Sequence, residues 1–317
     1  MSKSKELNDD LPISHKIAEE IVTIRDCLRW ATSRFLEAEL YYGHGTDSAW
    51  DEAVHLVLQE LFLPLDIDNS IMDAKLTFSE RKKIIECVYR RVVERVPLPY
   101  LTHVSWFAGL RFYVDKRVIV PRSPIGELIR NNYAPWVKVD ETRNILDLCS
   151  GSGCIGIASA YVFEDATVTL SDLSSDAIDV AKRNIKEHHL EDRVKVVKSD
   201  LFSALSGEHY DLIVSNPPYV NKSDFQSMPA EYKHEPKMAL EAGLDGLDIV
   251  KRILRQAPHH LNDNGVLIVE VGNSQEALVE LYPDVPFTWL EFEDGGDGVF
   301  LLTSEQLIKY HEIFVKG

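Results

Sequence analysis

Apolar residues recur at intervals of three and four positions through the first part of the chain, which is the spacing of amphipathic helices. Isoleucines and a leucine at this spacing predict one helix across residues 14–41. A second such pattern covers residues 50–61 and stops at Pro64, because proline cannot continue a helix. A third begins at Ser79, a residue type that caps helices, and stops before Pro97. We therefore expect the chain to begin with a small helical domain.

The pattern then changes to short alternating stretches, which are typical of strands. Two of them flank Asp115-Lys116 and predict a β-hairpin with its turn at that point. From about residue 143, strand-like and helix-like segments alternate, which favours a parallel sheet with helices on both faces. The last two strand-like segments are separated by only six turn-forming residues, so they must pair antiparallel. The expected strands are 143–149, 166–171, 193–198, 210–215, 265–271, 287–292 and 299–303, and the clearest helices between them are 174–190 and 245–258.

The composition is that of a soluble globular protein with a real core, since 45% of the 317 residues are hydrophobic and 27% are charged. We expect a cytoplasmic location, because no apolar run is long enough to span a membrane and the polar N-terminus does not resemble a signal peptide. The four cysteines form no Cys-x-x-Cys pair, so no metal site is expected. The formal net charge of -17 would repel free nucleic acid and attract a basic protein.

A glycine-rich stretch, DLCSGSGCIGIA at residues 147–158, follows the first strand of the alternating region and opens a helix. It contains the pattern Gly-x-Gly-x-x-Gly, which is found where a backbone approaches a dinucleotide or similar ligand closely. A tight turn between a strand and a helix, with no ligand, would also fit this pattern alone.

Three acids strengthen the ligand interpretation, because they stand at the carboxyl ends of three successive strands, where ligands bind in such sheets. Asp172 can accept hydrogen bonds from both hydroxyls of a ribose, which NAD and S-adenosylmethionine both contain. Asp147 stands directly before the glycines, where it would repel a pyrophosphate but pair with the ammonium group of S-adenosylmethionine. Asp200 is placed to accept a hydrogen bond from an adenine amino group, with Leu201 against the ring. The acids therefore favour S-adenosylmethionine.

The fourth strand leads directly into Asn216-Pro217-Pro218-Tyr219. The prolines remove backbone donors and fix the path of the chain, so that carbonyl oxygens and the Asn216 amide remain as acceptors. This set fits an amino group on a planar system, whose two N–H groups would donate to the Asn216 side chain and the Pro217 carbonyl. The nitrogen lone pair would then be aimed at a methyl donor, and Tyr219 would stack on the planar group.

Asn-Pro-Pro-Tyr together with the glycine loop resembles the amino-methyltransferases that use S-adenosylmethionine, which include adenine-N6 DNA enzymes and protein glutamine-N5 enzymes. The rest of the chain resembles the glutamine branch, with matching blocks at 112–129, 147–158, 216–220, 235–250 and 291–303. The resemblance implies an α/β, Rossmann-like methyltransferase fold whose mostly parallel seven-stranded sheet ends in an antiparallel hairpin. It also implies three parts, which are a helical substrate-recognition domain at 1–97, a β-hairpin linker at 98–125 and a catalytic domain at 126–317.

Two bacterial groups within the glutamine branch act on different proteins. One modifies the Gly-Gly-Gln glutamine of peptide release factors, and the other modifies a glutamine of ribosomal protein L-three. Release-factor enzymes usually read Pro-Arg-Pro-Glu-Thr-Glu where this chain has PRSPIGE at 121–127, and they usually have glycine at the position of Cys149. Both departures, and the tail at 295–303, resemble the ribosomal-protein group. The resemblance thus implies N5-methylation of ribosomal protein L-three, met free or in an assembly intermediate, with release factor as the alternative substrate.

The resemblance also implies which residues form the site. The predicted cofactor-binding residues are Asp147, Cys149, Ser150, Gly151, Ser152, Gly153, Asp172, Asp200, Leu201 and Asn216, and the predicted catalytic residues are Asn216, Pro217, Pro218 and Tyr219. Trp106 and Phe107 are predicted to wall the glutamine pocket, although aromatic residues there would also fit a core. Two rivals remain, which are an adenine-N6 nucleic-acid methyltransferase and an assembly factor that binds the cofactor without using it. The negative charge argues against the first rival, and the intact Asn-Pro-Pro-Tyr argues against the second.

Overall fold

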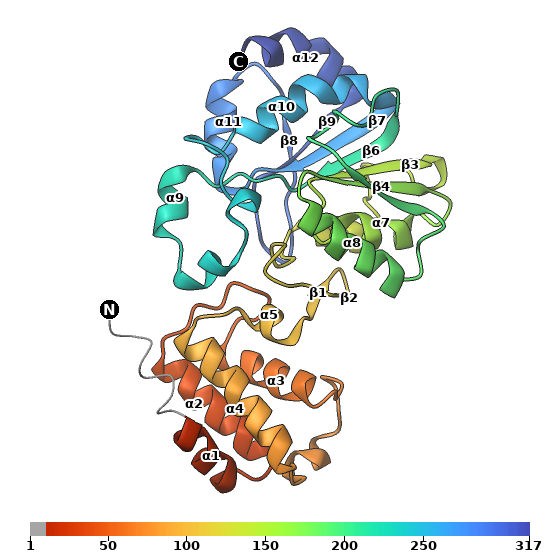
Figure 1. Cartoon of the computed structure of the whole chain (residues 1–317). Helices are drawn as coiled ribbons and strands as arrows, with labels where there is room; N and C mark the ends of the chain where they lie inside the picture. Colours follow the sequence, from red (N-terminus) through yellow and green to blue (C-terminus); the bar gives the residue numbers. More distant parts are fainter. Residues whose placement is uncertain (1–10) are drawn as a thin grey trace. The chain divides into compact units, whose positions relative to one another are not determined.

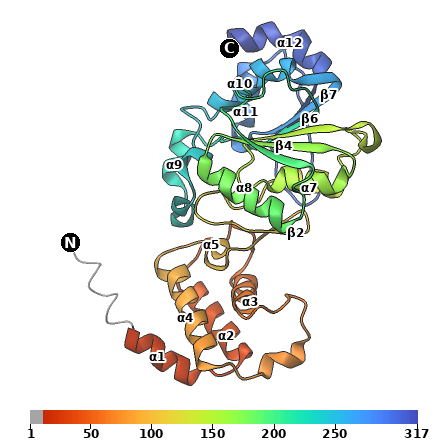
Figure 2. The same cartoon turned by 45° about the vertical axis from the view of Figure 1, so that its right-hand side comes forward.

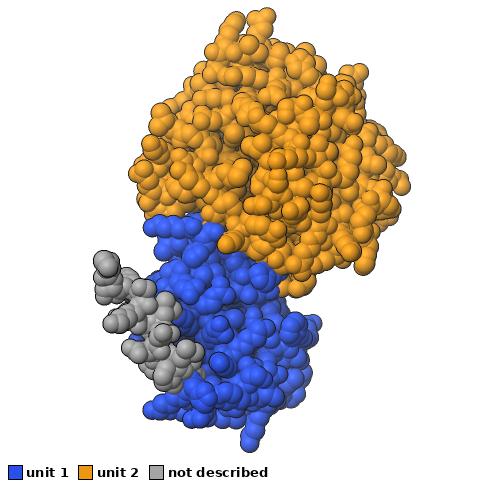
Figure 3. Space-filling model, in the orientation of Figure 1, with its two compact units in different colours: residues 1–103, 229–234 blue, residues 104–228, 235–317 orange. Residues whose placement is uncertain are grey.

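The computed structural model describes residues 11–317, which divide into two compact units (Figure 3). The first unit combines the chain up to His103 with the short segment 229–234, and the second unit contains the rest. The chain therefore leaves the second unit once and returns to it at Glu235. Nothing in the sequence pattern indicated this insertion. No helix of the described chain has the length and apolar character required to cross a membrane.

The first unit is helical, and its apolar helix faces meet in one cluster that includes Leu28, Phe35 and Leu56 (Figure 1). Its elements are α1 (Leu11–Glu20), α2 (Ile24–Glu37), α3 (Ala49–Glu60), η2 (Asn69–Asp73), α4 (Phe78–Val93), α5 (Leu98–Thr102) and the inserted η4 (Ala230–His234).

The single helix expected over 14–41 is wrong, because the chain starts a new helix at Thr23. The Thr23 hydroxyl accepts the N–H of Asp26 at 3.1 Å, and the Asp26 carboxylate accepts the N–H of Thr23 at 2.9 Å. This capping box provides side-chain acceptors for backbone N–H groups at the start of α2, so a new helix begins there. The same device begins α4 at Thr77, with Glu80 as its partner, instead of at the expected Ser79.

The inserted segment brings a carboxylate into the interior of the first unit. Glu231 is 2% exposed and pairs with Arg91, which is 1% exposed and also pairs with Glu52. Glu231 accepts a further hydrogen bond from the backbone N–H of Tyr41 at 3.2 Å and lies 3.4 Å from the guanidinium of Arg95. Because a buried charge is costly unless it is paired, this cluster depends on the insertion.

The predicted hairpin exists but is placed differently. Strands β1 (Ser105–Phe107) and β2 (Leu110–Phe112) pair antiparallel around a turn at Ala108-Gly109, where φ is 49° and 81°. The expected turn at Asp115-Lys116 is therefore wrong, and that segment is organised by side chains instead. The Arg117 guanidinium donates to both carboxylate oxygens of Asp115 at 2.7–3.1 Å. Burial acts to raise the pKa of Asp115, but the hydrogen bonds from Arg117 outweigh it and lower that pKa to about 2.

The second unit is built on a seven-stranded sheet. Its strands are β3 (Asn144–Leu148), β4 (Thr167–Asp172), β5 (Val194–Lys198), β6 (Tyr210–Ser215), β7 (Leu261–Glu270), β8 (Thr288–Trp289) and β9 (Val299–Thr303). They lie in the order β5-β4-β3-β6-β7-β9-β8, with β3 to β7 parallel and β9 antiparallel to both of its neighbours. This confirms the predicted parallel sheet with an antiparallel hairpin at its end.

Helices cover both faces of the sheet (Figures 1 and 2). Along β6, Leu212 and Val214 pack into one hydrophobic cluster and Ile213 packs into the other, because successive strand side chains face opposite sides. The first cluster lies under α6 (Ile125–Arg130), α7 (Cys154–Val162) and α8 (Ser175–Glu187), and the second lies under α10 (Asp248–Gln256), α11 (Gln275–Leu281) and α12 (Ser304–Lys316). The connecting elements are η3 (Val139–Glu141), α9 (Lys222–Ser227), η5 (Lys237–Ala239), η6 (Ala257–His259) and η7 (Gly272–Ser274).

The strand order determines where a ligand can bind. From β3 the chain adds β4 and β5 on one side and then returns to add β6 and β7 on the other. At such a reversal the helices leave the sheet in opposite directions, which opens a crevice at the carboxyl ends of the strands.

Candidate active site

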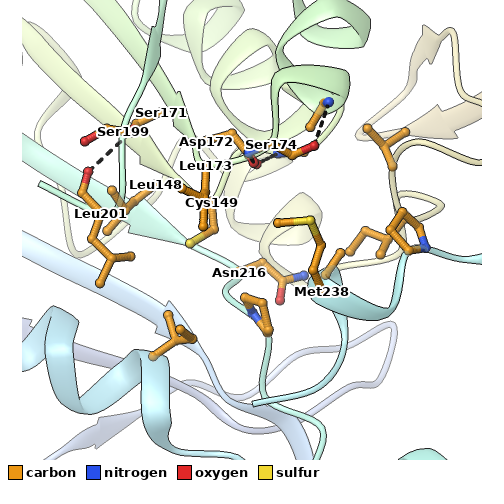
Figure 4. A pocket seen from close by; sticks show the side chains of 18 of the residues that line it. Leu148, Cys149, Ser171, Asp172, Leu173, Ser174, Ser199, Leu201, Asn216 and Met238 are labelled. Carbon is orange, nitrogen blue, oxygen red and sulfur yellow. Dashed lines mark hydrogen bonds between the residues drawn. The ribbon is translucent and has the colours of Figure 1, made fainter. Parts of the chain in front are cut away.

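A cavity lies at this reversal, at the carboxyl ends of β3 to β6 (Figure 4). It encloses about 770 Å³, open solvent at its mouth included. Each of the four strands contributes residues at its end, namely Leu148, Cys149 and Gly151, then Asp172 and Leu173, then Asp200 and Leu201, then Asn216 and Pro218. The structure thus brings together predicted residues that lie up to 69 positions apart in the chain.

The three glycines of the loop have different purposes. Gly151 lines the cavity with φ +54°, and a Cβ added there would meet no atom within 4 Å. A Cβ added at Gly153 or Gly156 would instead collide with Leu170 of β4. Gly153 and Gly156 therefore allow α7 to pack on the sheet, and Gly151 leaves space beside the cavity for a ligand.

Two residues with side chains also adopt the left-handed conformation at the cavity. Cys149 has φ 61° and Leu201 has φ 50°, which residues other than glycine rarely adopt. Such conformations persist where the surrounding structure fixes them, and they concentrate at functional sites. At Cys149, where release-factor enzymes usually have glycine, the backbone keeps the conformation that glycine would favour.

The carboxylate of Asp172 is held by hydrogen bonds from two backbone N–H groups. One of its carboxylate oxygens accepts the N–H of Gly151 and the other accepts the N–H of Ser174, both at 2.8 Å. Figure 4 shows Asp172 beside Ser174. Burial raises the pKa of Asp172, and these two hydrogen bonds oppose the rise. Each carboxylate oxygen can accept more than one hydrogen bond, so Asp172 still has acceptor capacity at the cavity.

Asp147, in contrast, is not brought to the cavity surface. It is fully buried, and one carboxylate oxygen accepts the N–H of Gly156 in the first turn of α7 at 2.8 Å. The other oxygen has no hydrogen-bond partner within residues 11–317. Burial raises the pKa of Asp147 to about 8, against the opposing effect of the Gly156 hydrogen bond. The expected direct contact with a cofactor ammonium does not fit this position, which lies behind the glycine loop.

Replacing Asp147 with asparagine should stabilise the free protein more at pH 8 than at pH 5. A carboxyl group with a pKa near 4 when unfolded and about 8 when folded lowers the free energy of unfolding as pH rises through that window, by at most about 1.4 kcal/mol per pH unit. Asparagine does not ionise, and its oxygen can still accept the Gly156 N–H. Thermal unfolding of both proteins from pH 5 to pH 8 measures the difference. A difference that stays constant with pH would contradict this account.

Of the other residues predicted to bind the cofactor, some lie at the cavity and some are buried in the interior of the second unit. Asp200 lines the cavity and forms an ion pair with Arg252 at 2.8 Å, with both side chains partly exposed. Ser150, Ser152 and Gly153 are buried on the inner side of the loop and do not line the cavity. The carbonyl of Ser152 accepts a hydrogen bond from a buried asparagine side chain on α8, so this part of the loop supports the lining residues.

The Asn-Pro-Pro-Tyr loop contributes Asn216 and Pro218 to the lining, and Figure 4 shows the Asn216 amide at the cavity on the side of Met238. Pro217 and Tyr219 do not line the cavity. The Tyr219 hydroxyl donates to Glu270 at 2.8 Å. Its ring would lie 2.6 Å from a Cβ added at Gly272, so only glycine accommodates it there. The loop is thus fixed from behind by the residues that follow β7.

Neither Trp106 nor Phe107 lines this cavity, and their predicted place in the wall of the glutamine pocket stays a prediction. Phe107 is 5% exposed and packs in the core of the second unit, against Phe112 and Gly126. Trp106 is its neighbour on β1, so its side chain faces the opposite side of the strand and is 49% exposed. The burial of Phe107 fits the core alternative.

Sequence reasoning missed two segments that complete the lining. They contribute Arg117, Val118 and Ile119 on one side and Pro236, Met238, Ala239 and Ile249 on the other. The two segments are joined by Glu235, which accepts hydrogen bonds from both terminal nitrogens of Arg122 at 2.6 and 2.7 Å and from the N–H of Val120 at 2.9 Å. The available signal was that the two segments fall in blocks 112–129 and 235–250, where the chain resembles the glutamine methyltransferases.

Comparison with known proteins gives matches over most of the chain. A family model described as "Methyltransferase small domain" matches residues 133–232. The chain is 56% identical over 301 residues to "Ribosomal protein uL3 glutamine methyltransferase" of Francisella tularensis subsp. tularensis, covering 95% of this chain and 96% of that protein. It is 51% identical over 296 residues to the protein of the same name from Neisseria gonorrhoeae, covering 93% and 98%. A solved structure of the hMettl16 catalytic domain with the MAT2A 3'UTR hairpin 1 is 23% identical, has a TM-score of 0.45, and covers 70% of this chain and 78% of that one.

Proposed function

The chain belongs to the family of ribosomal protein uL3 glutamine methyltransferases, and from this premise we propose that it methylates the side-chain amide nitrogen of a glutamine in ribosomal protein uL3 (L-three) with S-adenosylmethionine. The observation that carries the proposal is the identity of 51–56% to two such enzymes over nearly the whole of each chain. The cavity supports it, because Asp172 and Asn216 line the same space from neighbouring parts of the sheet.

The residues at the cavity fit S-adenosylmethionine. Gly151 leaves open space beside the loop, Asp172 offers carboxylate oxygens to ribose hydroxyls, and Leu201 offers an apolar surface to adenine. Asp200 provides an acceptor for the adenine amino group. When bound, the cofactor supplies an electrophilic methyl group on a sulfonium whose departure drives the transfer. The protein then has to orient the acceptor and exclude water.

The loop at the end of β6 is suited to orienting a glutamine amide. The amide nitrogen is a poor nucleophile because its lone pair is delocalised into the carbonyl group. Asn216 and the carbonyl of Pro217 would accept its two N–H groups, which favours a pyramidal nitrogen. Pro218 and the anchored Tyr219 keep these acceptors rigid. Positioning of this kind, with reacting atoms about 3–3.5 Å apart, is a large part of the catalysis.

A transfer assay with competing substrates tests the proposed function. The purified chain is incubated with methyl-labelled S-adenosylmethionine and, separately, with uL3, a peptide release factor and duplex DNA. Label should enter uL3 alone, and peptide mass spectrometry should place it on a glutamine. Label in the release factor or in DNA, or no label in any substrate, would overturn the proposal.

Free uL3 should react much faster than the mature large subunit, and its association rate should fall steeply with salt. The enzyme carries 51 acidic and 34 basic residues, so it attracts a basic protein and is repelled by the RNA surface of an assembled ribosome. Screening shortens from about 10 Å at 0.1 M to about 3 Å at 1 M, which removes the steering. Single-turnover rates for both substrates across a salt series measure this. Equal rates, or a rate for free uL3 that does not change with salt, would refute the electrostatic argument.

A further inference from the structure

Glu270, the last residue of β7, is a buried carboxylate directly behind the Asn-Pro-Pro-Tyr loop. It is 4% exposed, and both of its carboxylate oxygens accept hydroxyl hydrogens. One accepts from Tyr219 at 2.8 Å, and the other accepts from Ser123, which precedes α6. Burying a carboxyl group lowers the stability of the folded protein unless the group is hydrogen-bonded, so a functional role would explain its presence here. Neither the cofactor contacts nor the acceptor contacts proposed above use it.

The sheet places Glu270 beside the point at which the Asn-Pro-Pro-Tyr loop begins. Ser215 pairs with Val269 across the parallel strands β6 and β7, so the next residues in register are Asn216 and Glu270. Beyond this point, Ser274 donates its hydroxyl to the Tyr219 carbonyl at 2.8 Å. Tyr219 is therefore fixed at its hydroxyl, at its ring and at its carbonyl, and its hydroxyl contact is with a carboxyl group.

We propose that Glu270 is a positioning residue, which orients Tyr219 through its carboxylate and thereby holds Asn216 and the Pro217 carbonyl in the geometry that methyl transfer requires. The inference rests on the proposed function. Burial raises the pKa of Glu270, and the hydrogen bonds from Ser123 and Tyr219 and the charge of Arg122 oppose the rise. In its ionised form the carboxylate only accepts hydrogen bonds, so both hydroxyls donate to it and their orientation is fixed. Hydrogen bonds to an ionised acceptor are also shorter and stronger than neutral ones. A glutamine at this position has one oxygen and one NH2 group, so one of the two hydroxyls would have to turn and accept.

The test compares Glu270→Gln, Tyr219→Phe and the double variant in single-turnover and steady-state transfer to uL3, with cofactor affinity measured by calorimetry. Glu270→Gln should lower kcat by about ten- to a hundredfold, because small misplacements of reacting groups have effects of this size. The cofactor affinity should stay within about threefold, and the melting temperature should stay near that of the wild type. The double variant should be no slower than the slower single variant, since both changes break the same contact. Glu141→Gln, which neutralises an exposed carboxylate paired with Lys138, is the matched control and should be fully active.

Multiplicative losses in the double variant would overturn the inference, because they would show that Glu270 acts independently of Tyr219. A kcat within twofold of wild type in Glu270→Gln would also overturn it, as would an equal loss of cofactor affinity. If Glu270→Gln does not fold, Tyr219→Phe decides alone, and wild-type kcat in that variant refutes the inference. The wild-type rate on uL3 is measured first, so failure of the proposed function is seen separately from failure of this inference.

Discussion

Replacing Asn216 with alanine is expected to slow methyl transfer by a factor of about 10²–10³ while the affinity for S-adenosylmethionine changes by less than about threefold. Asn216 lines the cavity at the end of β6 and would accept an N–H group of the substrate amide. The loss of one preorganised hydrogen-bond partner in a transition state typically has an effect of this size. Turnover at saturating cofactor and calorimetric titration of the cofactor measure the two quantities separately.

The matched control is Asn273→Ala, an exposed asparagine that follows β7 and lies outside the cavity lining. It should retain full activity. If Asn216→Ala keeps a tenth or more of wild-type turnover, then Asn216 does not orient the acceptor. If cofactor affinity falls as much as turnover, then Asn216 belongs to the cofactor site.

Replacing Asp172 with alanine is expected to do the reverse and weaken cofactor binding by about 10²–10⁴. The substitution would remove two charge-assisted hydrogen bonds to ribose hydroxyls, each of roughly 1.5–3 kcal/mol. The substitution also leaves the N–H groups of Gly151 and Ser174 without their acceptor, which loosens the loop that surrounds the ligand. Calorimetry of the free enzyme with S-adenosylmethionine gives the dissociation constant directly.

Two further variants separate the ribose contact from the loop contact. Asp172→Asn keeps one oxygen for a backbone N–H and should weaken binding less than alanine does. Asp179→Ala removes an exposed carboxylate from α8 and should leave the dissociation constant unchanged. If Asp172→Ala binds the cofactor as tightly as the wild type, then Asp172 neither contacts the ribose nor holds the loop in a conformation that binding requires.

The central strands could be predicted because their residues are apolar on both faces, which buried parallel strands require. Features decided by one or two polar contacts could not be predicted. The break at Thr23 keeps Ile21 and Ile24 at helical spacing, so the apolar pattern continues across it. The hairpin turn at Ala108-Gly109 lies between two short strands whose alternation extends into the segment closed by Asp115 and Arg117.

The same limit applies to the site. Cys149, Asp172, Asp200 and Asn216 could be located because each ends or follows a strand in an ordered series. Asp147 lies one residue before the end of β3, so it is still within the strand and is buried behind the glycine loop. Glu270 could not be found from a local motif, because its partners Tyr219 and Ser123 stand 51 and 147 positions away in the chain.

The insertion of 229–234 into the first unit has a consequence for how the protein folds while it is being synthesised. Glu231 is needed beside the buried Arg91, yet it emerges from the ribosome about 130 residues after His103. At a synthesis rate of roughly 5–20 residues per second, the interval between the synthesis of His103 and that of Glu231 is on the order of ten seconds. During that interval Arg91 has Glu52 as a partner but lacks Glu231. The first unit is therefore completed late, because its final contacts form only after β3 to β6 of the second unit have been made.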